Sequence, residues 1–322
     1  MWGCVQMNTV VGFRQFSLPR LNLVETHLDP ERGVYWAYMQ HHARPCFTPA
    51  LLSDLTRYVD SIQDGAGRFA DQEGRPCHVS YAVIASRVSG IFSLGGDLEL
   101  FKQAIVRRER TALVHYGRQC VDTLYRWWQN CSLPLTTISL VQGDALGGGF
   151  ECALSSSFIV AEESARMGFP EVLFNLFPGM GAYSFLVRKI GRQLTEQIIS
   201  SGATYTARQL HDMGIVDIVA ADGLGEAAVS TFIATHSRSS NGRRGIEAVA
   251  REIQPLKHEE LVRVVDIWAD AALRLGERDM KLMDRLLRAQ SRRQILADVS
   301  PKELATVVRL TPSLASNRAA AD

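Results

Sequence analysis

The sequence has almost no excess of charge of either sign. Its 35 Lys and Arg residues stand against 34 Asp and Glu residues, so the formal net charge is +1, and a general electrostatic attraction to nucleic acid or an acidic membrane is not expected. No stretch reaches the roughly 18 uninterrupted apolar residues of a membrane-spanning helix, and the N-terminus lacks the basic segment and apolar run of a signal peptide. These absences predict a cytoplasmic protein that neither inserts into membranes nor binds nucleic acid.

Metal, disulfide and nucleotide motifs are missing too. The six cysteines form no C-x-x-C pair and the eight histidines no H-E-x-x-H spacing, so we expect reduced, mostly buried thiols and no metal. The triple glycine at 147–149 is not followed by Gly-Lys-Ser/Thr and lacks the spacing of a Rossmann motif, which argues against the common nucleotide sites. The sequence therefore predicts no resident cofactor and favours small, apolar partners.

The 322 residues, 46% of them hydrophobic and 21% charged, are enough to bury a large core. No clear periodic element is present before residue 30, whereas the apolar spacing after residue 223 is almost entirely helical. These patterns predict an N-terminal extension (1–30), a core (31–222), a C-terminal helical region (223–299) and a flexible tail (300–322).

Strand-like and helical patterns alternate through the core, which predicts an α/β fold. Apolar or alternating runs indicate strands, a loop is expected at 62–76, and a single long helical stripe follows Asp97, which is expected to cap it. Gly276 is expected to divide the last helical stretch in two. The expected strands are 34–39, 78–85, 136–141, 158–160 and 216–219, and the principal expected helices are 98–130, 150–156, 207–213 and 259–293.

Two glycine-rich turns are candidates for binding negative charge. The glycines at 147–149 separate the strand-like run 137–141 from a helical pattern, and the N–H groups at the start of a helix are free to bind an anion. We assign one such donor to the amide of Gly148. A second apolar run, 91–97, also ends in a Gly-Gly turn, and we assign its donor to the amide of Leu94. Two backbone donors aimed at one point would form an oxyanion hole suited to thioesters and enolates.

Two glutamates accompany these turns. Glu151 follows the triple glycine, and Glu171 comes 20 residues later in Phe-Pro-Glu. Two carboxyl groups close together in an apolar site do not both ionise readily, so one would donate a proton and the other accept one. Taken singly, each has a plainer reading, as a helix-start carboxylate or a turn cap; their combination with the glycines favours catalysis. The neighbouring Glu162-Glu163 pair is interpreted as a solvated strand end.

The motifs FSLGGD (92–97), QGDALGGGFE (142–151) and FPE…FPGMG (169–181) resemble the crotonase, or enoyl-CoA hydratase/isomerase, superfamily. The resemblance covers about residues 34–293 and rests on three motifs in the same order and spacing. It implies a superhelix of repeated ββα units and a homotrimer in which the C-terminal helices cover a neighbouring subunit.

Within that superfamily, the segments 173–185 and 283–293 look like the diffusible-signal-factor (DSF) synthases, which make bacterial quorum-sensing signals. This resemblance implies dehydration of a 3-hydroxyacyl thioester on acyl carrier protein to the cis-2-enoyl thioester, followed by hydrolysis to the free acid. It also implies a second partner, the receiver domain of a sensor histidine kinase. The alternative is an enoyl-CoA hydratase/isomerase that acts on CoA thioesters.

The same resemblance implies a closed acyl pocket and the residues that line it. For Trp268 and Leu286, plain helix packing remains the alternative reading. A non-enzymatic regulator is disfavoured because both glutamates are present. The residues expected to bind substrate are Leu146, Gly147, Gly181, Trp268 and Leu286.

Overall fold

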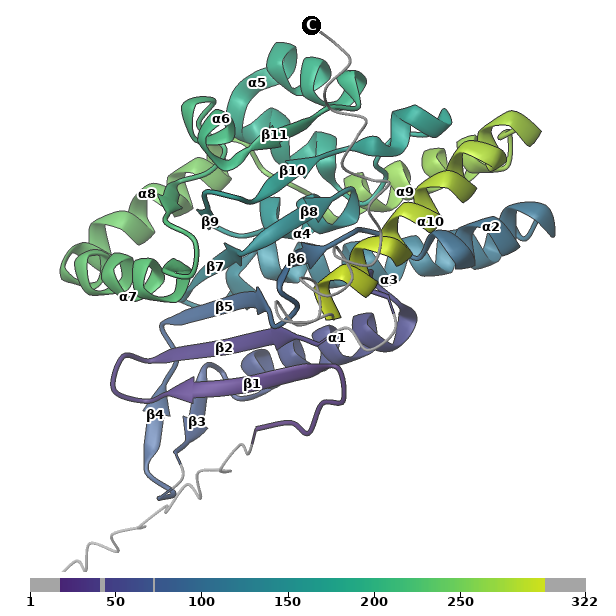
Figure 1. Cartoon of the computed structure of the whole chain (residues 1–322). Coiled ribbons are helices and arrows are strands. Elements are labelled where there is room, and N and C mark those ends of the chain that lie inside the picture. The colour runs from purple at the N-terminus through teal and green to yellow at the C-terminus, as the bar shows by residue number, and fades with distance from the viewer. Residues whose placement is uncertain (1–17, 41–43, 72, 299–322) are drawn as a thin grey trace, which may run out of the picture.

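The chain winds through two sheets, and each turn of the winding adds one strand to both of them (Figure 1). The structure, a computed structural model, describes residues 18–40, 44–71 and 73–298. The larger sheet has the strand order β1-β2-β5-β7-β9-β12 and the smaller one β11-β10-β8-β6. The strands are β1 (Val24–Asp29), β2 (Val34–Met39), β5 (Tyr81–Ser86), β6 (Gly90–Ser93), β7 (Thr136–Val141), β8 (Gly143–Leu146), β9 (Phe158–Glu162), β10 (Arg166–Gly168), β11 (Thr204–Thr206) and β12 (Ile218–Ala220).

The repeated unit is a strand in each sheet followed by a helix. β5 and β6 lead to α2 and α3, β7 and β8 to α4, and β9 and β10 to α5, while equivalent strands of successive turns pair in parallel. This arrangement confirms the predicted superhelix of ββα units. The helices are α1 (Pro49–Asp64), α2 (Leu98–Val106), α3 (Arg110–Trp128), α4 (Gly148–Leu154), α5 (Ala182–Ser201), α6 (Ala207–Asp212), α7 (Gly225–His236), α8 (Ser240–Ile253), α9 (His258–Ala272) and α10 (Glu277–Asp298).

The large sheet is covered on both faces, which explains why its central strands are completely buried. All six residues of β2, β5 and β7 are buried, as expected for parallel strands between two layers. Val229 and Ile233 of α7 pack on one face, while Leu51 and Leu55 of α1 belong to the main core on the other. The main core surrounds the cavity described below.

Two predicted elements were wrong in their boundaries. The single helix expected at 98–130 is divided into α2 and α3 because Arg108 adopts a left-handed φ of 55° between them. The loop expected at 62–76 contains the end of α1 and one strand of a hairpin, β3 (Arg68–Ala70) paired with β4 (Pro76–His78). The predicted cap is confirmed, since Asp97 Oδ1 accepts the N–H of Leu100 at 3.2 Å.

The N-terminal extension was also predicted wrongly in part. Residues 24–29 form β1, which pairs antiparallel with β2 at the edge of the large sheet. Its side chains are mostly polar and partly exposed, so it carries no continuous apolar run. Residues 1–17 and the tail at 300–322 lie outside the described residues.

The C-terminal region continues from β12 as helices α7 to α10, and the break predicted at Gly276 lies between α9 and α10. Glu162 is buried rather than solvated, because its carboxylate accepts the N–H of Gly225 at the start of α7. The five cysteines in the described part of the chain are free thiols, four of them buried. Among the described residues, no helix is both long and apolar enough to span a membrane.

Candidate active site

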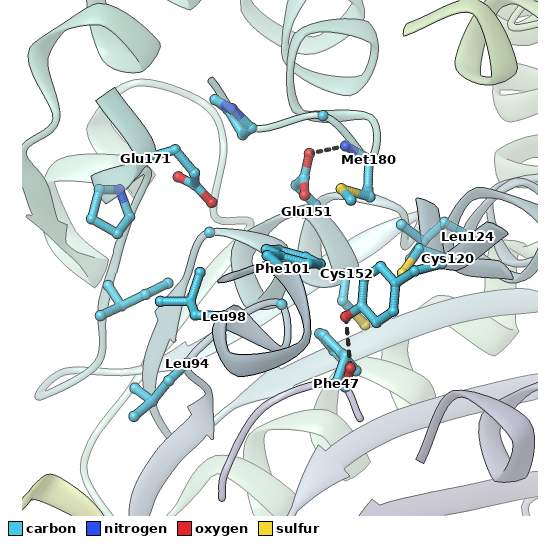
Figure 2. Close-up of a pocket in the computed structure, with 18 of the residues that line it drawn as sticks. Phe47, Leu94, Leu98, Phe101, Cys120, Leu124, Glu151, Cys152, Glu171 and Met180 are labelled. Atoms are coloured by element: carbon cyan, nitrogen blue, oxygen red, sulfur yellow. Dashed lines mark hydrogen bonds between the residues drawn. The ribbon is translucent and has the colours of Figure 1, made fainter. Parts of the chain in front are cut away.

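A largely apolar cavity of about 490 Å³ lies between α1, α3 and α4, with α9 and α10 contributing to its wall. The lining residues Leu55 of α1, Ile84 of β5 and Trp127 of α3 are buried, whereas the lining residues Leu173 and Thr204 are exposed to solvent. A cavity of this size and lining suits an apolar ligand bound along most of its length. Figure 2 shows that both predicted glutamates extend toward this space.

Glu151 lies in the first turn of α4 and is only 1% exposed. Its Oε1 accepts two backbone hydrogen bonds, from the N–H of Met180 at 2.8 Å, as Figure 2 shows, and from the N–H of Ala182 at 3.0 Å. Burial raises the pKa of the carboxyl group to about 7, and the two N–H donors oppose that rise by favouring the ionised form. Glu151 is therefore poised to change protonation state near neutral pH.

Glu171 follows Pro170 in the short helix η2 (Pro170–Phe174). Its Oε2 is enclosed and has no hydrogen-bond partner among the described residues. Burial, and then the nearby charge of Glu151, raise the pKa of Glu171 to about 8. An unpaired buried oxygen favours the protonated form, so Glu171 holds its proton at a pH where Glu151 begins to lose its own.

Gly147 makes room for the Glu171 carboxyl group. A Cβ built on Gly147 would lie 2.2 Å from Glu171 Oε1, and the residue has a φ of 53° and a ψ of −122°. Both the space and the backbone angles therefore require glycine here. Through this contact, the turn that begins α4 brings Glu171 beside the helix that carries Glu151.

The predicted oxyanion donor at Leu94 is wrong. The N–H of Leu94 donates to the carbonyl oxygen of Pro45 at 2.7 Å and is not free to bind a ligand. The amide two residues later is better placed: a Cβ built on Gly148 would lie 3.3 Å from the nitrogen of Gly96. Both glycines line the cavity, and neither N–H donates to another described residue. Gly96 and Gly148 thus supply the pair of adjacent backbone donors.

Tyr116 of α3 fixes the Gly96 turn. Its buried hydroxyl donates to the carbonyl oxygen of Phe47 at 2.6 Å and accepts the N–H of Asp97 at 3.2 Å. An ion pair between Arg44 and Asp97 holds the same turn from outside. No local sequence pattern indicates this network, because its members come from three separate segments.

Of the five residues expected to bind substrate, Leu146, Gly147, Trp268 and Leu286 line the cavity. Gly181 is not among its lining residues, so its contact with substrate stays a prediction. With a φ of 125°, Gly181 precedes α5 and separates the two residues whose N–H groups bind Glu151. Its role is to let the backbone turn so that both donors meet one oxygen.

Two acid groups of different protonation beside two backbone donors can move protons at a carbon next to a polarised carbonyl group. The matching family model is described as "Enoyl-CoA hydratase/isomerase" and covers residues 71–256. The "Probable enoyl-CoA hydratase echA8" of Mycobacterium leprae is 30% identical over 184 residues, which are 56% of this chain and 68% of that protein.

Solved structures agree on the fold. An enoyl-CoA hydratase/isomerase from Xanthobacter autotrophicus Py2 superposes with a TM-score of 0.66 at 22% identity, and the match covers 87% of this chain and 98% of the Xanthobacter chain. Human mitochondrial delta3-delta2-enoyl-CoA isomerase has a TM-score of 0.66 at 18% identity and covers 84% and 99%, respectively. Together, the match over more than half of the residues and this shared architecture show that the chain belongs to the enoyl-CoA hydratase/isomerase family.

Proposed function

We propose that the protein adds water reversibly across the 2,3 double bond of an enoyl thioester, with Glu151 and Glu171 as the catalytic pair. The observation that carries the proposal is the contrast between the two carboxyl groups. One accepts two N–H donors and has a pKa of about 7, and the other has an unpaired oxygen and a pKa of about 8. Between these values, a carboxylate and a carboxylic acid face one apolar cavity.

In the hydration direction, Glu151 takes a proton from water as the water oxygen bonds to the β carbon. The electron pair of the double bond shifts to the α carbon, where it forms a C–H bond with the proton of Glu171. Glu151 ends protonated and Glu171 ionised, and proton exchange with solvent restores the starting state. Dehydration is the same path reversed.

The negative charge that develops in this step rests on the thioester oxygen. The N–H groups of Gly96 and Gly148 would stabilise it, because they are adjacent, line the cavity and have no acceptor among the described residues. Removing one donor of such a pair typically costs about 3 to 4 kcal/mol in the barrier.

The test is turnover of a 2-enoyl-CoA by purified Glu151→Gln and Glu171→Gln variants. Each should lose a factor of about 10² to 10⁴, the usual contribution of a positioned acid or base. Glu247→Gln is the matched control, since Glu247 is also a partly buried glutamate but lies on α8, away from the cavity lining. Parental rates in both active-site variants would refute the proposal.

A second candidate is the synthesis of a DSF-type cis-2-unsaturated fatty acid from a 3-hydroxyacyl group on acyl carrier protein. One observation favours it: Leu146, Trp268 and Leu286, implied by the synthase resemblance, line a single cavity despite their separation in the sequence. Matched acyl chains on CoA and on acyl carrier protein, with mass spectrometry of released acids, distinguish the candidates. Only the synthase should release a free cis-2-enoic acid.

The assembly and partners follow as proposals from the same resemblance. A homotrimer predicts a solution mass of three chains, which light scattering measures. A regulatory partner predicts that the protein is retained on an immobilised receiver domain of a sensor histidine kinase. Retention at the level of an unrelated protein would remove that partner from the proposal without affecting the catalytic pair.

A further inference from the structure

Trp268 of α9 lies directly against the backbone that supplies the donors to Glu151. A Cβ built on Gly179 would lie 2.3 Å from Cγ and 2.4 Å from Cδ1 of the Trp268 indole. Trp268 is 2% exposed, so the ring is enclosed and cannot swing into solvent. Gly179 immediately precedes Met180, whose N–H donates to Glu151.

The indole also contacts the oxyanion turn through one further ring. Phe101 meets Trp268 edge to face, with ring centroids 5.0 Å apart and planes at 69°. A Cβ built on Gly96 would lie 2.6 Å from Cζ of Phe101. Two packed aromatic rings therefore fill the space between the segment 179–182 and the Gly96 turn.

Trp268 is held from behind by the packing of α9 on α3. Arg110 of α3 pairs with both Asp266 and Asp270, which flank Trp268 in the sequence. Val265 packs closely on Gly117 of α3: a Cβ built on Gly117 would lie 2.5 Å from Cγ1 of Val265. The indole therefore rests on a fixed support, whereas the segment it contacts contains two glycines, Gly179 and Gly181.

We propose that Trp268 is a positioning residue, whose indole holds the segment 179–182 in the conformation in which Met180 and Ala182 donate their N–H groups to Glu151. The inference rests on the proposed function of Glu151 and goes beyond a role in lining the acyl cavity. A residue that only lined the cavity would affect substrate affinity. A residue that holds these donors also sets the protonation of Glu151.

The consequence is a change in titration. Two N–H donors favour the carboxylate, so their displacement raises the pKa of Glu151. The other titratable groups that face Glu151 are Glu171 and the thiol of Cys120, and the atoms nearest to a Cβ built on Gly179 all belong to Trp268. Loss of one such hydrogen bond to the carboxylate should move the acid limb of the pH–rate profile upward by about one pH unit.

The experiment compares Trp268→Leu and Trp268→Phe with Leu286→Ala, which enlarges the same cavity from α10 at a residue that is not among the nearest contacts of a Cβ built on Gly179. We expect Trp268→Leu to lower kcat about tenfold on the acid side, with Trp268→Phe giving a smaller shift because it retains a ring. Leu286→Ala should raise KM and leave the pH profile in place. A Trp268→Leu variant that raises KM alone would overturn the proposal.

A second readout does not depend on turnover. In protein labelled with ¹³C at the glutamate carboxyl carbons, the Glu151 resonance is assigned by its absence in Glu151→Gln and titrated in each variant. The proposal expects a higher titration midpoint in Trp268→Leu, and in Trp268→Phe if the leucine variant does not fold. An unchanged midpoint refutes it. A parental protein without hydratase activity would instead refute the proposed function.

Discussion

Replacing Gly147 with alanine should separate catalysis from folding. The new Cβ would lie 2.2 Å from Oε1 of Glu171, so the carboxyl group must turn away. Because the clash is with the end of a flexible side chain, the fold should survive. The backbone angles, φ 53° and ψ −122°, add a strain on the order of 1 to 3 kcal/mol.

The expected result is a modest loss of stability with a large loss of turnover. Displacing Glu171 removes one member of the acid–base pair, which typically contributes about 10² to 10⁴ in rate. Strain of this size should lower Tm by roughly 2 to 4 °C per kcal/mol in a domain of this class. Turnover is measured as the loss of ultraviolet absorbance when a 2-enoyl-CoA is hydrated, and the change in Tm is measured by calorimetry.

Gly191→Ala is the matched control for this variant. Gly191 also has a glycine-only conformation, φ 74° and ψ 172°, but an added Cβ there meets nothing within 4 Å. It should therefore lose comparable stability and keep its activity. The reasoning fails if Gly147→Ala retains parental kcat, or if both variants lose activity equally.

Two further predictions concern the electrostatics and the oxyanion turn. The folded-state pKa values of Glu151 and Glu171, about 7 and about 8, lie above the ordinary value of 4.5. Between pH 4.5 and 8 the folded protein therefore binds more protons than the unfolded chain, and the contribution of these groups to stability is lost as pH rises through about 8. Denaturant titrations should show that the free energy of unfolding declines less steeply with pH in Glu171→Gln than in the parental protein, and parallel curves would contradict the assignment. Tyr116→Phe leaves the carbonyl oxygen of Phe47 and the N–H of Asp97 without their hydroxyl partner. This variant should lose about 1 to 3 kcal/mol of stability, and its kcat should fall by a larger factor than its KM rises. An unchanged kcat would show that the turn does not depend on this bridge.

The parts of the fold that were predictable are those with a strong local signal. Strand β2 is continuously apolar, every residue of β2 and β7 is buried because both faces of the sheet are covered, and α1 begins at a Thr-Pro cap. β1 was missed because an edge strand exposes polar side chains. The break between α2 and α3 was missed because Arg108 is a common helical residue whose left-handed φ follows from the packing of two helices in different directions.

In the site, too, residues with a local sequence signal could be predicted and those that depend on distant contacts could not. The motifs predicted both glutamates and Gly148 as site residues because chemistry ties residue type to spacing, and the three residues line one cavity. The partner amide at Gly96 could not, since the N–H of Leu94 is occupied by the carbonyl oxygen of Pro45, 49 residues earlier in the sequence. The second glycine of the Gly-Gly turn was the available signal. The role of Gly181 is harder to predict, because a motif cannot distinguish a residue that lines a cavity from one that shapes the backbone beside it.

The pH dependence of kcat/KM for hydration tests the central claim most directly. If one glutamate acts as a base and the other as an acid, the active form carries one proton on the pair, whichever residue holds it. The account predicts a bell-shaped profile with limbs near the pKa values of about 7 and about 8, and the loss of one limb in each Glu→Gln variant that retains measurable turnover. A rate that keeps rising after both groups have ionised, or one that is independent of pH across this range, would contradict it.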